Sequence, residues 1–405
     1  MRKLEYKIKL KLRTPLVIGG KKLGNNYIKS MDYIPGSVFR AALAREILNR
    51  CPYYDGGRNK IYWVEFKNQN QCGNCRLRNL CKDFSNLKID TLYPLGGKPY
   101  PNTNMRCKYN SSHGNVDMLL YKINRHIGVN IPYNGQCPIC NERLEKHDGL
   151  GKDGRDIEGI YTLITKNGVN PYIKASRDGV LYSLDVLNER IFLDDEERDT
   201  EFEGAIESNL DILEDLKHIG TLRIGAYTTS GFGKCTFYSK IAENKENIQT
   251  LKNRIEKFNS YIENGQRFYI SLDLLSDAYL GLEDTFSDSI LPFAIGTEEF
   301  VNKYEEKLKD YIGGGLKLEI PMVNNEWRRG FDTSQRVSTY RRAKIVSKSG
   351  SVFVFSIAKD KIDYEKLLQI QCKGIGDNRE HGFGKIEICP REHIDNRMKT
   401  RGYKE

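Results

Sequence analysis

Short stretches of the chain alternate between apolar and polar residues, and this period of two predicts half-buried strands. One stretch covers residues 5–12, and a second, residues 267–275, opens the latter part of the chain. Apolar residues at helical spacing follow them over residues 38–49 and 300–311, and residues 247–263 form a charged amphipathic pattern. The succession of strand, turn and helix therefore occurs twice, with a helix expected between the two halves.

Residues 51–158 break this regularity. They are rich in Gly, Asn, Cys and Pro and show little periodicity, and a structureless loop of that length is uncommon inside a domain. Residues 159–165 and 180–185 then alternate again as strands. We therefore expect an insertion that a bound metal holds together.

The cysteines of this insertion indicate metal sites, because Cys-x2-Cys pairs in a reducing compartment bind metals more often than they form disulfides. A tetrahedral zinc needs four ligands, so one or two structural zinc ions are expected; spacing alone does not rule out an iron–sulfur cluster, and buried free thiols are the other alternative. The candidate ligands form two groups, although spacing alone also allows mixed sets: Cys51, Cys72, Cys75 and Cys81, and Cys107, His113, Cys137 and Cys140. The single cysteines in apolar runs are predicted core residues: Cys235, Cys372 and Cys389.

The net charge of +10 is unevenly distributed. Residues 185–215 contain thirteen acidic and two basic residues, so the rest of the chain carries an excess of 21 positive charges. Such an excess is typical of proteins that bind polyanions, although a generally basic protein with solvated lysines also shows it. The acidic stretch itself is expected to be an exposed linker or insertion.

Two glycine-rich loops, residues 223–234 and 374–385, each contain Gly-Phe-Gly beside basic residues and precede a short strand. Glycine lets the backbone approach a bulky ligand closely, and outward-facing amides can contact phosphate oxygens. A simple hairpin turn is the alternative for either copy. The occurrence of the pattern in both halves favours a shared binding role.

Residues 324–348 are a further basic element, in which arginines are interspersed with Trp327, Phe331 and Tyr340. Arginine pairs with phosphates and aromatic rings stack on unpaired bases, which favours single-stranded RNA over duplex DNA. A solvated loop with aromatic anchors is the alternative. The candidate RNA-binding residues of the whole chain are Arg40, Arg223, Lys234, Arg328, Arg329, Arg336, Arg341, Arg342, Gly376, Arg379, His381, Gly382, Phe383, Gly384 and Lys385.

Two motifs resemble the RAMP (repeat-associated mysterious protein) superfamily of CRISPR systems. They are Tyr-Ile-Pro-Gly-Ser at residues 33–37 and Gly-x-Gly-x-x-Arg-x-x-Gly-Phe-Gly at residues 374–384. Residues between them, including the Cys-Pro-Ile-Cys at 137–140, look like the RAMP subunit peculiar to type III-D effector complexes. The first glycine loop departs from the motif, because Arg223 stands where the first glycine belongs and the central arginine is missing.

The resemblance implies an α+β fold with two ferredoxin-like (RNA-recognition-motif-like) domains in tandem and a zinc-binding, cysteine-rich insertion in the first. The N-terminal domain is expected over residues 1–240 with the insertion at about 51–158, the linker helix over 241–265, and the C-terminal domain over 266–405. The implied function is a non-catalytic subunit of a type III CRISPR effector complex. It would hold single-stranded CRISPR RNA near the 5′ handle, beside the large polymerase-like subunit, and would meet target RNA through the guide.

Two other functions are open at this point. An endoribonuclease that processes CRISPR RNA would use a histidine as general acid or base, and His381 is the candidate. A zinc-dependent adaptor would bind only proteins, through the insertion and the acidic stretch. The chain has no membrane-spanning apolar run and no signal-peptide pattern, so we expect a cytoplasmic protein.

Overall fold

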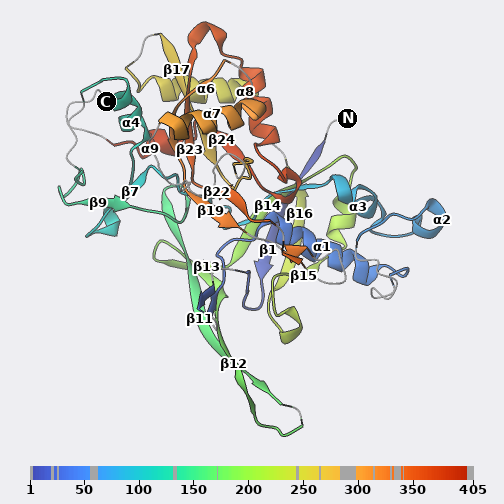
Figure 1. Cartoon of the computed structure of the whole chain (residues 1–405). Helices are drawn as coiled ribbons and strands as arrows, with labels where there is room; N and C mark the ends of the chain where they lie inside the picture. The colour runs from blue at the N-terminus through green and yellow to red at the C-terminus, as the bar shows by residue number, and fades with distance from the viewer. Residues whose placement is uncertain are drawn as a thin grey trace. The chain divides into compact units, whose positions relative to one another are not determined.

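The computed structural model of the chain describes residues 3–19, 22–24, 27–54, 63–130, 135–170, 172–242, 246–263, 266–282, 298–312, 315–328, 331–332, 339–340 and 342–398. Two compact units divide the chain between them. Unit 1 comprises Met1–Gly97, Asp156–Glu243 and Glu380–Gly382, and unit 2 comprises Lys98–Arg155, Asn244–Arg379 and Phe383–Glu405. Helices and strands occur in both units, which confirms the α+β class (Figure 1). Among the described ranges, no helix is long and apolar enough to cross a membrane.

Unit 1 is built on a sheet with the strand order β15-β16-β1-β14-β4, and β5 also pairs with β14. Its strands are β1 (Leu4–Leu12), β4 (Lys88–Ile89), β5 (Tyr93–Pro94), β14 (Glu201–Ser208), β15 (Thr221–Arg223) and β16 (Lys234–Ile241). Its helices are α1 (Gly36–Arg50), α2 (Gln69–Cys72), α3 (Arg78–Asp83) and α5 (Leu213–Lys217). Alternate apolar residues of β1 share a core with Phe39 and Leu43 of α1. Burial of each such side chain contributes about 1.5–3 kcal/mol, which fixes the helix on this face of the sheet.

The acidic stretch, residues 185–215, is not an exposed linker, and that expectation was wrong. It contains β13 (Glu196–Asp199) and β14, whose residues all pair with β1. Alternate residues of β14 are buried, whereas Glu201 and Glu203 lie 2.8 and 3.4 Å from the Lys9 ammonium on the other face. Acidic residues on one strand thus pair with lysines on its neighbour, a relation that a charge count along the chain does not reveal.

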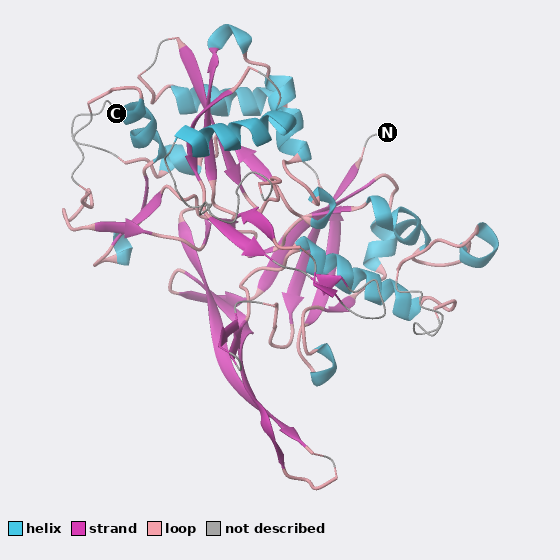
Figure 2. Ribbon diagram, viewed as in Figure 1, coloured by secondary structure: helices cyan, strands magenta, loops and turns pink. Residues whose placement is uncertain are grey.

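Two long strands, β11 (Arg155–Val169) and β12 (Ser176–Leu193), form a twisted antiparallel ribbon (Figure 2). β2 (Lys22–Gly24) and β3 (Tyr27–Lys29) extend the sheet beside β12. Both ribbon strands are longer than the alternating stretches of the sequence. The reason is that hydrogen bonds between strands continue where no core is present to impose a hydrophobic period.

Unit 2 has a central sheet with the order β18-β23-β17-β24. Its strands are β17 (Arg267–Leu274), β18 (Lys317–Met322), β23 (Val352–Ala358) and β24 (Ile386–Ile388). Smaller strands are β6 (Lys98–Pro99), β7 (Asn104–Cys107), β8 (Asn115–Asp117), β9 (Leu144–Lys146), β10 (Leu150–Lys152), β19 (Asn325–Arg328), β20 (Phe331–Asp332), β21 (Thr339–Tyr340) and β22 (Lys344–Ser347). The helices are α4 (Leu119–His126), α6 (Ile248–Asn259), α7 (Glu298–Ile312), α8 (Tyr364–Lys373) and α9 (Glu392–Asp395).

A buried charged network joins residues 98–155 to the main sheet of unit 2. The His393 imidazole lies with Nδ1 3.0 Å from Asp117 of β8 and with Nε2 2.8 Å from Asp273 of β17. All three side chains are buried, and the hydroxyls of Thr103 and Ser271 donate to the two carboxylates. Burial opposes the charge, but the two carboxylates hold the pKa of His393 well above its ordinary 6.5. The network therefore contains a charged histidine between two acids.

Candidate functional site

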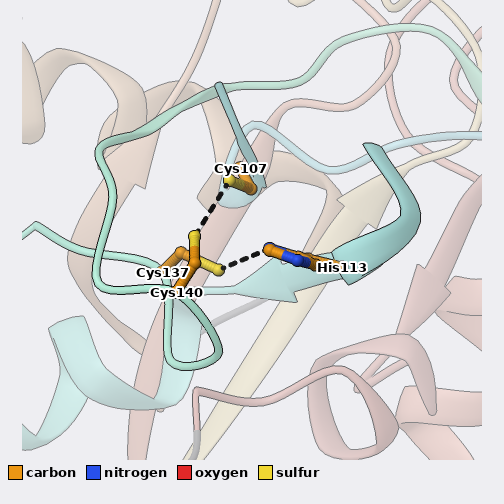
Figure 3. A group of neighbouring side chains, drawn as sticks. All are labelled: Cys107, His113, Cys137 and Cys140. Carbon is orange, nitrogen blue, oxygen red and sulfur yellow. Dashed lines mark hydrogen bonds between the residues drawn. The ribbon is translucent and has the colours of Figure 1, made fainter. Parts of the chain in front are cut away.

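One group of predicted ligands is assembled as a possible metal centre in unit 2 (Figure 3). The ligand atoms of Cys107, His113, Cys137 and Cys140 all lie within 4.8 Å of one another. The Sγ atoms of Cys107 and Cys140 are 3.6 Å apart, and Cys137 Sγ is 3.5 Å from His113 Nδ1. Sulfur atoms on a tetrahedral zinc, with Zn–S bonds of about 2.3 Å, lie roughly 3.8 Å apart. The donor set therefore fits a single ion, and this grouping of predicted ligands is confirmed as a cluster.

Tight turns present these ligands. Cys107 ends β7, His113 ends a short 3-10 helix, and the chain turns at Asn141, with a left-handed φ of +60°, directly after Cys140. Burial acts to raise the pKa of the Cys107 thiol, but the amides of the two residues after Lys108 donate to it and lower its pKa overall. In this way the backbone stabilises a thiolate, the form that binds metal.

The other cysteines divide differently. Cys235 and Cys389 are buried, as expected, and burial raises the pKa of each thiol to about 12. Cys372 was expected in the core but is exposed, because α8 buries Leu367 and Ile370 on its opposite side. The remaining four line one cavity in unit 1: Cys51, Cys72, Cys75 and Cys81. No three of these four sulfur atoms lie within 4.8 Å of one another, as the ligand atoms of the first cluster do.

Glycine loop 1 (residues 223–234) and glycine loop 2 (residues 374–385) share a backbone conformation over residues 224–233 and 375–384. The Ile224 amide donates to the Gly233 carbonyl at 2.8 Å, and the Ile375 amide donates to the Gly384 carbonyl at 2.9 Å. Left-handed φ values occur at corresponding positions: Gly225, Tyr227, Gly231 and Gly233 in loop 1, and Gly376, Asn378, Gly382 and Gly384 in loop 2. The repeated sequence pattern is therefore a repeated structure.

The glycines serve the packing of each loop on the chain itself. A Cβ on Gly233 would lie 1.9 Å from the Ile224 carbonyl oxygen, and one on Gly384 would lie 1.7 Å from that of Ile375. Several loop 1 amides also donate to backbone carbonyls: those of Ala226, Ser230, Gly231, Phe232 and Gly233. The expectation that the loop amides face outward to cradle phosphate was wrong for these five amides of glycine loop 1.

Aromatic and basic side chains gather beside glycine loop 1. The rings of Tyr182 and Tyr227 stack with centroids 5.9 Å apart, and Phe232 meets Tyr227 edge-on. The Lys166 ammonium lies 4.6 Å from the Phe232 ring centroid, and Lys234 is exposed. Sequence reasoning missed Lys166 and Tyr182. They face each other across the two strands of the ribbon. Pairing the two alternating stretches of residues 159–185 as a hairpin would have brought them together.

The tip of glycine loop 2 is packed instead of open. Residues Glu380–Gly382 belong to unit 1, where the Thr91 hydroxyl donates to the Gly382 carbonyl at 3.2 Å. A Cβ on Gly382 would lie 2.7 Å from the Ile89 carbonyl oxygen. His381 is half-buried, and burial together with the Arg40 charge lowers its pKa.

Several predicted arginines already bind groups of the protein. The Arg40 guanidinium donates to the carbonyls of Phe84 and Leu87, at 2.6 and 2.9 Å, and Arg328 pairs with buried Asp277 at 2.7 Å. The other predicted residues vary in exposure: Arg223, Lys234 and Arg342 are exposed, Arg379, Phe383 and Lys385 are half-buried, and Gly376, Gly382 and Gly384 are buried. Arg329, Arg336 and Arg341 lie outside the described residues.

The main sheets offer little of the open aromatic face on which RNA-recognition motifs stack bases. In unit 1 the outer face carries ion pairs such as Lys9–Glu201, and its exposed aromatic ring is Tyr238 of β16, the cross-strand partner of Lys9. In unit 2 nearly every residue of β17 and β23 is buried, on both faces. The loops and the ribbon therefore offer more surface for a ligand than the sheets do.

Comparison with known proteins bears on the family. The structure resembles a chain of the type III-B Cmr-β complex bound to cognate target RNA and AMPPnP, with a TM-score of 0.39, 11% identity, and coverage of 90% of this chain and 94% of that one. A chain of the same complex bound to cognate target RNA is similar with a TM-score of 0.38 and 10% identity, and the coverage of both chains is the same. No curated protein matches the chain. A model of the RAMP superfamily matches residues 9–236, from β1 into β16, which is more than half of the chain. The chain thus belongs to the RAMP superfamily.

Proposed function

We propose that the chain is a subunit of a type III CRISPR effector complex that holds CRISPR RNA without cutting it. It would lie near the 5′ handle of the RNA, beside the large polymerase-like subunit, and would reach target RNA through the guide. Membership of the RAMP superfamily is the observation that carries this proposal. The excess of positive charge outside residues 185–215 agrees with a polyanionic ligand.

Both units are inferred to be ferredoxin-like domains. In unit 2 the succession β17-α7-β18-β23-α8-β24 forms a sheet of order β18-β23-β17-β24. In unit 1 the succession β1-α1-β4-β14-α5-β16 occurs in the corresponding order β4-β14-β1-β16, with β15 added at the edge. Two β-α-β units that interleave antiparallel strands in this way account for both patterns.

The inferred RNA contact is glycine loop 1 with the neighbouring ribbon. Its exposed tip, the Tyr182–Tyr227 pair and the two lysines combine cationic groups with ring faces, as single-strand binding requires. Glycine loop 2 has less surface to offer, since its tip is packed on residues 89–91.

We infer that His381 does not cleave the RNA that the chain binds. Its Nε2 lies 3.6 Å from the Glu380 carboxylate, and no second histidine is among the ring contacts within the described residues, so two histidines are not paired here as acid and base. We expect His381→Ala to leave RNA intact and its affinity little changed. Cleavage of a repeat hairpin RNA by the wild type, abolished in His381→Ala, would establish the endoribonuclease alternative.

The double variant Lys166→Ala with Lys234→Ala is expected to weaken binding of a single-stranded repeat RNA. Two lost phosphate contacts should lower the slope of log affinity against log salt by about 1.4, at about 0.7 for each contact. Fluorescence anisotropy at several salt concentrations measures both effects on the full chain.

A matched control removes the same charge elsewhere. Lys361 and Lys366 are exposed residues of unit 2 near α8, and Lys361→Ala with Lys366→Ala should leave the salt slope unchanged. Equal slopes for both double variants would remove glycine loop 1 from the interface. Failure of the wild type to bind RNA at all would instead favour the adaptor function.

For the Cys107, His113, Cys137 and Cys140 cluster, we infer one structural zinc ion. Three thiolates and an imidazole nitrogen are a closed tetrahedral donor set, and such sites stabilise small folds that lack a large core. Here the neighbouring apolar residues are few, chiefly Leu144 and Met105. The zinc would therefore hold together β7, β8 and β9.

Cys140→Ser is expected to lose this zinc and to loosen residues 98–155, because structural zinc contributes roughly 10–16 kcal/mol of binding free energy in small peptides. Elemental analysis should fall from about one zinc per chain to near zero, and limited proteolysis should cut within this segment. Cys372→Ser, at an exposed position of α8, is the control that keeps the metal. A wild type without zinc would contradict the inference.

A further inference from the structure

A second set of four cysteines surrounds a cavity of about 470 Å³ in unit 1. Cys51 directly follows α1, Cys72 ends α2, Cys75 lies in the next turn, and Cys81 lies in α3. None of the ten cysteines forms a disulfide. Three separate segments thus direct thiols to one space, and no bond between them explains the convergence.

The turn between α2 and α3 has the backbone of a thiolate-binding loop. The Cys75 amide donates to the Cys72 carbonyl at 3.0 Å, and the Leu77 amide donates to Cys75 Sγ at 3.5 Å. The Cys81 amide donates to the Leu77 carbonyl at 2.9 Å, so the third cysteine follows within the first turn of α3. An amide directed at sulfur stabilises the ionised form that ligates a metal.

The spacing of these sulfurs differs from that of the zinc cluster. Around this cavity no three Cys, His, Asp or Glu ligand atoms of the described chain lie within 4.8 Å of one another. Four sulfurs on one zinc lie roughly 3.8 Å apart, as the unit 2 cluster nearly achieves. As placed, the four thiols are thus too widely spaced to ligate one ion together, and the cavity between them has room for a larger group.

The walls of the cavity suit a cluster of several metal atoms. Ile47, Leu48 and Leu77 supply apolar surface, and Arg76 and Arg78 also line the space. Arg50 lines it too, but its guanidinium is bound to Glu46 and to two carbonyls. A cubane iron–sulfur cluster binds each of four cysteines at a different iron and carries negative charge, which nearby arginines balance. Apolar walls limit the access of water and oxidants to such a cluster.

We propose that Cys51, Cys72, Cys75 and Cys81 bind a [4Fe–4S] cluster, which fastens the α2–α3 segment to the end of α1. This site is independent of the zinc cluster and of the proposed RNA contact. The wide spacing of these thiols favours the iron–sulfur cluster over zinc, two possibilities that the sequence spacing leaves open.

The test is metal analysis of the full chain purified without oxygen. We expect a broad visible absorbance together with about four iron and four sulfide per chain, besides the zinc of unit 2. Cys75→Ser should lose the absorbance and most of the iron while it keeps the zinc. Cys140→Ser should do the reverse, and Cys372→Ser should keep both metals.

The retained zinc and an unchanged circular dichroism spectrum show that Cys75→Ser still folds, so loss of iron cannot be ascribed to general unfolding. Two zinc ions per chain and no iron, with one zinc removed by Cys75→Ser, would overturn the proposal. Thiols that remain unmetallated after anaerobic reconstitution with iron and sulfide would overturn it too.

Discussion

Replacement of His393 by alanine is expected to lower the free energy of unfolding by about 3–5 kcal/mol, because it leaves Asp117 and Asp273 buried without a counter-charge. The imidazole nitrogens lie 3.0 and 2.8 Å from the two carboxylates, and all three side chains are almost fully buried. The denaturant midpoint of the full chain, followed by circular dichroism, measures the loss. We expect the free energy of unfolding of His393→Gln to lie between those of the wild type and His393→Ala, since glutamine keeps a hydrogen bond without the charge.

The pH dependence has a definite sign. The pKa of His393 is raised in the folded state, so the stabilisation from its charge is complete below the unfolded value of about 6.5 and is lost only as the pH rises through the raised value. Burial works against the Asp117 carboxylate, but His393 lowers the pKa of that group overall, so its stabilisation disappears as the pH falls through the lowered value. The difference between wild type and His393→Ala should be largest near neutrality and should shrink in strong alkali and strong acid.

His126→Ala is the matched control. This exposed histidine of α4 also faces an acid, the half-buried Glu319, at 3.4 Å, and because the imidazole is open to solvent we expect the pair to contribute no more than about 1 kcal/mol. A His393→Ala loss as small as that of the control would mean that the buried network is a neutral hydrogen-bonded set instead of a charged one.

Local sequence patterns predicted local structure well. The alternation over residues 5–12 is that of β1, and the helical spacing over 300–311 is that of α7. Residues 267–275 contain the expected strand β17, but it is buried on both faces instead of half-buried. The Cys-x2-Cys spacing and His113 located the ligands of the unit 2 cluster. Each of these patterns comes from residues that meet the same neighbour at a fixed period, so a single sequence contains the information.

What the sequence did not predict depends on partners far apart in the chain. The acidic residues of β14 match lysines of β1 almost two hundred positions away, so their charge alone suggested a linker. Arg40 was predicted to bind RNA, yet carbonyls near residue 85 occupy its guanidinium. The glycines of both loops were explained by a ligand, whereas for Gly233 and Gly384 a carbonyl of the same loop lies where a side chain would have to be.

Gly233→Ala is expected to lower the free energy of unfolding by about 2–5 kcal/mol. A left-handed alanine costs about 1–2 kcal/mol, and overpacking adds about 1–3 kcal/mol. The new Cβ would lie 1.9 Å from the Ile224 carbonyl oxygen, and this is backbone that cannot rotate away. Because that carbonyl is fixed within the loop, relief of the clash must displace the loop tip, and RNA affinity should fall together with stability. Denaturant midpoints and RNA anisotropy measure the two effects.

Gly231→Ala separates the effect of the clash from that of the backbone strain. Gly231 and Gly233 both lie in glycine loop 1 with left-handed φ values, +95° and +68° respectively. A Cβ on Gly231 meets nothing within 4 Å, so this variant should lose only the roughly 1–2 kcal/mol of the strained backbone. Equal losses in the two variants would show that strain alone governs the loop. A larger loss in Gly233→Ala, repeated in Gly384→Ala of glycine loop 2, would show that close backbone packing makes these glycines necessary in both halves.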